Sequence, residues 1–375
     1  MAHYVKAAEL GHGGRMTLPQ RVYKSPDVFS EEIEHIFLRH WVCAGREALI
    51  PTAGDYFVRS IDTESVIVLR GRDGAVRAFH NVCRHRGTRI CEAYRGSFSN
   101  AIRCPYHAWT YGLDGRLLAA TSMTNVDGFD PTEYSLHSVA VAIWDGFVFL
   151  SLANSPLPFE SSHAALIGRF ERYGIAGLAS LKRIDYDVRA NWKLIFENYN
   201  ECYHCPSVHP KLVKLSSATS GANDLTSGAF LGGYMEVRPG FESMSLSGKS
   251  CGIPVGPLPE EDRHRVYYYS IFPNMLLSLH PDYVMVHTLW PQSPDCTLIE
   301  CEWLFHPDSG QIPDFDPDDA VGFWDRTNRE DWHICEQSQL GIASRAFRPG
   351  PYFPREGISA AFDREYERAM AGEAD

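Results

Sequence analysis

Two short pairs of metal-binding side chains stand out in this sequence of 375 residues. Cys83 and His85 form the first pair, Cys104 and His107 form the second, and 18 residues lie between them. Two thiolates on one iron and two imidazoles on the other can hold a [2Fe–2S] cluster, whose potential then lies far above that of an all-cysteine cluster. A tetrahedral Cys2His2 zinc site uses the same ligand types and stays open as an alternative. Zinc fingers, however, usually group Cys with Cys and His with His.

The residues around the two pairs narrow this choice. They read NVCRHRG and CPYHAWTYGLDGRL. These segments resemble the Rieske domain of ring-hydroxylating and demethylating oxygenases, in which two loops each supply one Cys and one His. The resemblance implies a [2Fe–2S] cluster held by the two pairs. It also implies that Trp109 and Tyr111 pack beneath the cluster, although aromatic residues in a strand are more often part of a core.

A second candidate site lies in residues 191–210, NWKLIFENYNECYHCPSVHP. The run from Trp192 to Tyr203 lacks Gly and Pro, which predicts a helix. The spacing of Glu197, Glu201 and His204 would then place them on one helical face. Pro206 would break the helix, so that His209 turns back toward His204. Two His and one carboxylate form the facial triad of non-haem Fe(II) oxygenases, which leaves positions open for O2 and substrate.

The resemblance assigns a role to one carboxylate near these histidines. At the position of Glu201, Rieske oxygenases carry a carboxylate that is hydrogen-bonded to the first iron-ligating His. This carboxylate also reaches a cluster-ligating His of the neighbouring subunit and bridges the electron transfer. Many members carry Asp there, whereas this chain carries Glu. A carboxylate behind a ligating His also fixes its tautomer. Glu197 is interpreted as either a pocket residue or a structural one, and Cys202 and Cys205 as structural residues without a disulfide.

The third iron ligand must come from a distant part of the chain. The segment VGFWDRTNREDWHICEQSQLGI reads as a long helix without Pro. Trp324, Asp331 and Cys335 share one face of that helix by their spacing. The segment resembles the late helix on which the family carries its third ligand, an Asp, and Asp331 is the candidate. Other acids of the segment are interpreted as parts of solvated faces: Asp325, Glu330 and Glu336.

The elements that position these residues predict an α+β fold. Residues 41–155 alternate short β-branched and aromatic runs with turns, as in SVIVLRGRDGAVRAFHNV and GFVFLSL, which predicts a small antiparallel β domain. Residues 1–40 and 156–375 would form a larger catalytic domain, in which iron-bearing helices close over an antiparallel sheet. The resemblance implies a helix-grip (START-like) arrangement there. Helices are also expected at 31–41, with Ser30 as N-cap, and at 163–182.

Composition excludes several classes of function. The net charge of −12 argues against nucleic acid or an anionic membrane surface as a partner. No apolar run approaches the ~20 residues of a transmembrane helix, and the N-terminus lacks the apolar core of a signal peptide. Ten cysteines without such a signal fit a reducing compartment. The expected location is therefore the cytoplasm.

The substrate class is suggested by three further segments. ENYNECYHC, LLSLHPDYVMVHTLWP and ICEQSQLGIASRAFRPGPY resemble most the glycine betaine, choline, carnitine and stachydrine oxygenases. A quaternary ammonium ion has no N–H group to donate in a hydrogen bond and is best held by aromatic faces. The candidates for such a cage are Tyr199, Tyr203, Phe230, Tyr234, Tyr267, Tyr269 and Trp290. Aromatic residues at such positions are more often core residues.

The resemblance implies a function with several components. An NAD(P)H-dependent flavin or ferredoxin-type reductase would reduce the cluster, and electrons would pass through Glu201 of the adjacent subunit of a homotrimer to iron held by His204, His209 and Asp331. O2 would then oxidise a quaternary ammonium compound, with N-demethylation of glycine betaine or a similar betaine and release of formaldehyde. Two alternatives stay open: an aromatic ring-hydroxylating dioxygenase that forms a cis-diol, and a non-catalytic Rieske carrier or zinc-binding module.

Overall fold

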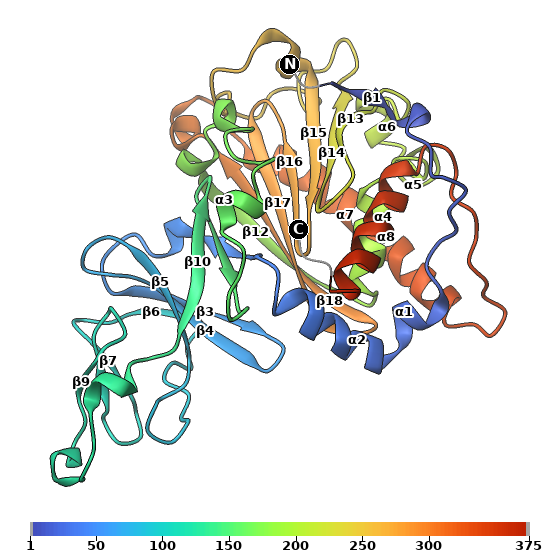
Figure 1. The fold of residues 1–375 in the computed structure, drawn as a ribbon. Helices are drawn as coiled ribbons and strands as arrows, with labels where there is room; N and C mark the ends of the chain where they lie inside the picture. Colours follow the sequence, from blue (N-terminus) through green and yellow to red (C-terminus); the bar gives the residue numbers. More distant parts are fainter. Residues whose placement is uncertain (1–2, 373–375) are drawn as a thin grey trace. The chain divides into compact units, whose positions relative to one another are not determined.

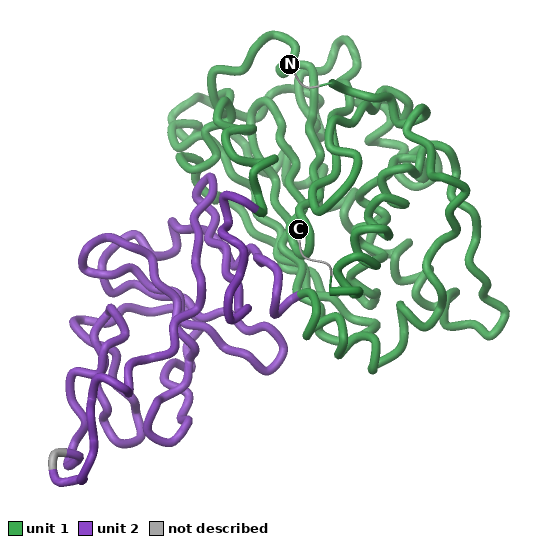
Figure 2. Tube along the Cα trace, viewed as in Figure 1, with its two compact units in different colours: residues 1–36, 162–375 green, residues 37–161 purple. Residues whose placement is uncertain are grey.

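The computed structural model describes residues 3–372. The chain divides into two compact units, one of residues 37–161 and one of residues 1–36 with 162–375 (Figure 2). The sequence placed the boundaries between the domains at 41 and 155. Within residues 3–372, no sheet is shared between the two units: one contains a single antiparallel sheet and the other contains two. Among the described residues, no helix is both long enough and apolar enough to cross a bilayer.

The unit of residues 37–161 consists of two antiparallel sheets. The larger sheet has the strand order β2-β11-β10-β5-β4-β3-β6, and the smaller one the order β7-β8-β9. The Asp-Gly turn joins β4 to β5 as predicted, with Gly74 at a φ of 81°. The strands are β2 (Val42–Arg46), β3 (Asp55–Ile61), β4 (Glu64–Arg70), β5 (Val76–His80), β6 (Arg95–Ser97), β7 (Ile102–Arg103), β8 (Thr110–Tyr111), β9 (Leu117–Ala119), β10 (Ser138–Trp144) and β11 (Phe147–Ser151).

The larger unit is built on one eight-stranded antiparallel sheet, with the order β1-β13-β14-β15-β16-β17-β18-β12 (Figure 1). The predicted succession of strands after residue 265 is confirmed as β15 to β18. The α+β fold class is therefore confirmed. The strands are β1 (Val5–Lys6), β12 (Ala179–Val188), β13 (Ala222–Thr226), β14 (Phe230–Glu236), β15 (Arg265–Ile271), β16 (Met275–Leu279), β17 (Tyr283–Ser293) and β18 (Cys296–Phe305).

Three helices, α4, α7 and α8, gather beside this sheet (Figure 1). The Asn191 side chain caps α4 by accepting a hydrogen bond from the backbone amide of Lys193. The Asp316 side chain caps α7 by accepting one from the backbone amide of Asp318. The helices of the chain are α1 (Gln20–Lys24), α2 (Pro26–Glu32), α3 (Phe159–Ser162), α4 (Trp192–Tyr199), α5 (Cys205–Val208), α6 (Leu212–Leu215), α7 (Pro317–Ile342) and α8 (Gly357–Met370).

Two helices predicted from the sequence have other bounds. The N-terminal one begins at Pro26 rather than 31, because Ser25 and not Ser30 caps it, and it continues as a π-helical turn over Ile33–Phe37. The helix predicted at 163–182 is wrong. Gly168 and Gly174 adopt positive φ angles there, the segment forms short turns, and strand β12 begins at Ala179.

A buried ion pair joins α2, α4 and α8. The Lys193 ammonium on α4 lies 2.5 Å from the Glu32 carboxylate at the end of α2, and neither side chain is exposed to solvent. The second oxygen of Glu32 accepts from the Trp192 indole, and Tyr366 of α8 donates to the carboxylate as well. Burial lowers the pKa of Lys193, and the charge of Glu32 opposes this shift. Each polar group of this buried ion pair has a hydrogen-bond partner. The ion pair therefore fixes the start of α4, from which the chain continues to His204 and His209.

We expect Lys193→Met to lower the free energy of unfolding by about 3–5 kcal/mol, because Glu32 would stay buried without its counter-ion. The double variant Glu32→Gln/Lys193→Met should recover most of this loss, since the amide oxygen of Gln can accept from Trp192 and its NH2 group can donate to the Tyr366 hydroxyl. Urea denaturation followed by circular dichroism measures both changes. A single variant as stable as the wild type would refute this account of how α4 is anchored.

Candidate metal sites and cavity

The two Cys/His pairs lie on two loops with the same hydrogen-bond pattern. The Cys83 amide donates to the Thr88 carbonyl while the Gly87 amide donates back to the carbonyl of Cys83. In the second loop, the Cys104 amide donates to the Trp109 carbonyl and the Ala108 amide donates to the Cys104 carbonyl. Gly87 and Ala108 occupy equivalent positions, and both have a positive φ, 72° and 59°. The chain thus builds two matched loops, each presenting one thiol and one imidazole.

These four side chains lie close together. The rings of His85 and His107 are 4.5 Å apart, and both thiols are buried and outside any disulfide. His85 Nδ1 is buried and has no hydrogen-bond partner among residues 3–372, as expected of an atom that binds a metal. Trp109 stacks on His85 at 4.9 Å, and the Tyr111 hydroxyl lies 3.2 Å from Cys83 Sγ. The donor set of two thiols and two imidazoles fits an iron–sulfur cluster, which these four side chains would hold.

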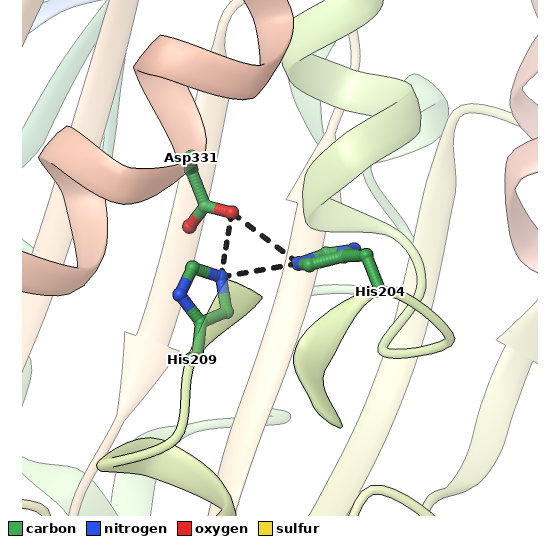
Figure 3. Close-up of side chains that lie close together, drawn as sticks. All are labelled: His204, His209 and Asp331. Atoms are coloured by element: carbon green, nitrogen blue, oxygen red, sulfur yellow. Dashed lines mark hydrogen bonds and ion pairs between the residues drawn. The ribbon is translucent and has the colours of Figure 1, made fainter. Parts of the chain in front are cut away.

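The second site is formed by His204, His209 and Asp331, which converge on one point (Figure 3). His204 Nε2 lies 3.2 Å from His209 Nε2 and 3.3 Å from Asp331 Oδ1, and His209 Nε2 lies 2.8 Å from the same oxygen. Ligand bonds of about 2.1 Å would place cis neighbours about 3 Å apart around an ion. The three donors therefore fit one face of a mononuclear iron site.

Each histidine is oriented by a carboxylate behind it. His204 Nδ1 lies 2.5 Å from Glu201 Oε1, and His209 Nδ1 lies 2.8 Å from Glu330 Oε2. Both imidazoles therefore direct Nε2 into the site. The prediction that Glu330 lies on a solvated face is wrong, because Glu330 precedes Asp331 on α7 and its carboxylate reaches Nδ1 of His209. Asp325 and Glu336 instead bind Tyr186 and the amide of Arg189.

The local electrostatics favour a bound cation. Burial lowers the pKa of His204, but hydrogen bonds with Asp331 and Glu201 outweigh burial and raise it to about 10. Burial raises the pKa of Asp331, but its bonds with the two histidines hold it below the usual range. Three carboxylates thus surround two imidazoles. A metal ion can displace the protons from the imidazole nitrogens, and its positive charge then replaces theirs in the attraction to the carboxylates.

The helix that leads to the site ends earlier than predicted. α4 stops at Tyr199, and Glu201 turns back to accept from the amides of Tyr203 and His204. Glu197 consequently does not share a face with Glu201 and His204. It accepts from the Tyr23 hydroxyl at 2.7 Å, and burial raises its pKa well above the usual range.

The segment between the two histidines also differs from the expectation. Pro206 lies in the first turn of the short helix α5, so it does not interrupt a helix between them; the break lies before His204. Cys202 and Cys205, expected to be separate structural residues, form a disulfide. The expectation was that a disulfide there would disturb His204, but the two Cα atoms lie 4.9 Å apart and the bond closes around His204 while its ring stays directed at the site.

A cavity of about 130 Å³ opens onto the three iron-ligand candidates. Of the proposed cage residues, Tyr199, Tyr203 and Tyr234 line it, whereas Tyr267, Trp290, Phe230 and Tyr269 do not. Three further aromatic residues line the cavity that were not among the predicted cage residues: Tyr268, Trp324 and Trp332. The Tyr199 hydroxyl donates to the carbonyl of Leu277, so this ring is fixed in the wall.

Strand register explains which aromatic residues reach the cavity. Tyr268, Ser278 and Met285 are cross-strand partners on β15, β16 and β17, so they share one face of the sheet. Tyr267 points to the opposite face, where its hydroxyl binds Asp262. Trp290 lies an odd number of residues from Met285 on β17 and also faces away. A pattern of three consecutive tyrosines could not tell which of them faces inward.

Comparison with known proteins places this geometry in a family. A model of the ring-hydroxylating alpha subunit catalytic domain matches residues 175–372, and a Rieske [2Fe–2S] domain model matches residues 40–130. The glycine betaine monooxygenase oxygenase subunit of Pseudomonas aeruginosa strain UCBPP-PA14 is 33% identical over 365 residues. That alignment covers 90% of this chain and 84% of the relative.

Solved structures agree with this assignment. A quaternary ammonium Rieske monooxygenase, described in connection with carnitine oxidation and inter-subunit electron transfer, matches with a TM-score of 0.82 at 25% identity, over 100% of both chains. Naphthalene 1,2-dioxygenase from Rhodococcus matches with a TM-score of 0.77 at 23% identity, over 96% of this chain and 95% of that one, and shows the shared fold. The chain is therefore an oxidoreductase of the Rieske oxygenase family, with a Rieske [2Fe–2S] domain and the catalytic domain of a mononuclear iron oxygenase.

Proposed function

We propose that this chain is the oxygenase component of a monooxygenase that N-demethylates glycine betaine or a similar betaine. The proposal rests on one observation, the aromatic cavity beside the candidate iron ligands. Tyr199, Tyr268 and Trp324 form a connected wall, with ring centroids 6.1 and 6.3 Å apart. Aromatic faces attract a quaternary ammonium ion, which has no N–H group to donate in a hydrogen bond. The similarity to a glycine betaine monooxygenase subunit supports the same substrate class.

The proposed reaction oxidises one N-methyl group. When bound, the cluster and the iron supply electron transfer and O2 activation. One oxygen atom enters a C–H bond of the methyl group, and the other leaves as water with two electrons and two protons. The hydroxymethyl product loses its hydroxyl proton and releases formaldehyde as the C–N bond breaks, which leaves the demethylated amine. The aromatic wall would hold the ammonium group so that a methyl group faces His204, His209 and Asp331.

The proposal includes partners for electron supply. An NAD(P)H-dependent flavin or ferredoxin-type reductase would reduce the cluster of a homotrimer. Electrons would then pass from a cluster imidazole of one subunit to Glu201 of the next, and through His204 to the iron. The 2.5 Å contact between Glu201 and His204 supports the step of this path that precedes the iron. Inter-subunit electron transfer has been described for the quaternary ammonium Rieske monooxygenase of similar fold.

A single-turnover experiment tests the function without a reductase. Anaerobically purified protein should contain about three irons and about two acid-labile sulfides per chain. We expect dithionite-reduced protein, mixed with O2 and glycine betaine or carnitine, to release formaldehyde. A diol from a simple aromatic compound, with no formaldehyde from any betaine, would favour a ring-hydroxylating dioxygenase. A chain with only the cluster, or with zinc, would refute the oxygenase function.

Glu201→Gln should leave both metal centres loaded but slow turnover about 10- to 100-fold, because the amide keeps the reach of Glu201 and loses its charge. Stopped-flow oxidation of the reduced cluster by O2 and betaine should slow by the same factor. Glu31→Gln, on the exposed side of α2, is the matched control. Wild-type rates in Glu201→Gln would contradict the bridging role, whereas loss of iron would indicate a purely structural one.

A further inference from the structure

The charged residues around the cavity are unevenly distributed. Glu201 and Asp331 line it, but both are bound to imidazoles of the iron site. His287 lines it too, and burial lowers its pKa to about 4, so it is neutral at pH 7. Among the described residues, Arg355 is the one Lys or Arg side chain that lines the cavity.

Arg355 has no carboxylate partner among residues 3–372. Its guanidinium lies 5.8 Å from the ring of Phe353, and Phe353 in turn stacks on Tyr203 with ring centroids 4.3 Å apart. Tyr203 is 52% exposed, so this group marks the side of the cavity that opens to solvent. The cavity therefore has aromatic walls near the iron ligands and, among residues 3–372, one guanidinium without a carboxylate partner near its opening.

We propose that Arg355 binds the carboxylate of a zwitterionic substrate, and that it selects betaines over choline, which lacks a carboxylate. This inference rests on the proposed function. A guanidinium can hold a carboxylate through two parallel hydrogen bonds, while the aromatic walls hold the ammonium end. The two ends of the substrate would thus be bound by the two ends of the cavity, which orients a methyl group toward the iron ligands.

The test compares two substrates that differ at this end. Arg355→Gln should raise KM for glycine betaine about 10- to 100-fold with little change in kcat, because a charged hydrogen bond made in both ground and transition state is lost. KM for choline should stay the same or fall. Arg355→Lys should recover part of the loss for betaine. Arg348→Gln is the control, since the Arg348 side chain binds backbone carbonyls of its own loop and does not line the cavity.

Three outcomes would overturn the inference. An unchanged KM for betaine, or an equal rise in KM for betaine and choline, would show that Arg355 does not recognise the carboxylate. Calorimetric titration of betaine and choline into each variant separates binding from turnover. If the wild type neither binds nor oxidises any betaine, the proposed function fails and this inference fails with it.

A different observation, the disulfide between Cys202 and Cys205, carries a second inference. It encloses Tyr203 and His204, directly after Glu201. Cys205 Sγ lies 3.9 Å from His204 Nε2, the nitrogen that faces His209 and Asp331. Both cysteines line the cavity, and Cys205 is buried. The sulfur of Cys205 is therefore within reach of the space that a bound metal and its further ligands would occupy.

We infer that this pair is a reversible redox site that controls access to the iron. A thiolate is a strong ligand for iron, and the facial triad leaves positions open. In the disulfide, Cys205 is bonded to Cys202 and cannot bind the metal. Oxidised glutathione can oxidise the two thiols to the disulfide and is itself reduced to two glutathione thiols, so two electrons and two protons are transferred. The reaction is reversible, and its direction depends on the ratio of reduced to oxidised glutathione. Reduction frees Cys205 to compete with O2.

Serine variants of the two positions test this inference. Protein equilibrated in glutathione buffers, alkylated and analysed by mass spectrometry should show Cys202 and Cys205 titrating together, unlike Cys296. The electron paramagnetic resonance signal of the nitric oxide adduct of the mononuclear iron should then differ between oxidised and reduced protein. In fully reducing buffer, Cys202→Ser, which keeps a free Cys205 thiol, should resemble the reduced form, whereas Cys205→Ser should resemble the oxidised form. Cys296→Ser is the control.

The inference would be wrong if the two thiols stayed reduced at every glutathione ratio. It would also be wrong if Cys202→Ser and Cys205→Ser gave the same signal, because the sulfur of Cys205 would then not reach the iron. Both readouts are independent of turnover, so they hold whatever the substrate is.

Discussion

The Asp331 carboxylate, shared by two imidazoles, is the interaction on which the catalytic unit depends. One oxygen of Asp331 lies 2.8 Å from His209 and 3.3 Å from His204, although 122 residues separate Asp331 from His209 in the chain. Without a cation, two histidines and three carboxylates would be a costly cluster to bury. A bound metal ion resolves this problem, because it neutralises the carboxylate and replaces the imidazole protons. The surrounding structure can be understood as the scaffold that keeps these donors together.

Two structural features bring the donors to one point. α7 is long enough to carry Trp324 and Trp332 into the cavity wall and Glu330 and Asp331 to the histidines. α4 ends at Tyr199, where the chain leaves the helix and presents His204 and His209 from a loop and a short helix. The ion pair of Glu32 and Lys193 fixes the start of α4, so the loop leaves from a rigid element. Catalytic geometry of this kind requires such support.

The sequence could predict those features that are formed by residues close together in the chain. The Cys/His pairs, the two histidines five residues apart and the Asp-Gly hairpin are local patterns whose chemistry or turn geometry is fixed within a few residues. The site residues missed depend on long-range placement. Tyr268 and Tyr267 are neighbours of the same type, and only the register with Ser278 and Met285 decides which of them faces the cavity. Glu330 orients His209 only because α7 packs against the loop that carries it. The end of α4 depends on how Glu201 folds back on Tyr203 and His204, which helix propensity alone cannot foresee.

Iron occupancy of the Asp331→Ala variant tests the central claim most directly. Mössbauer spectroscopy of protein enriched in ⁵⁷Fe separates the cluster irons from mononuclear ferrous iron. Because Asp331 is the carboxylate that both histidines share, the account predicts that the variant keeps its cluster signal and loses the mononuclear iron. Mononuclear iron bound at the wild-type level in the variant would contradict the assignment of this site.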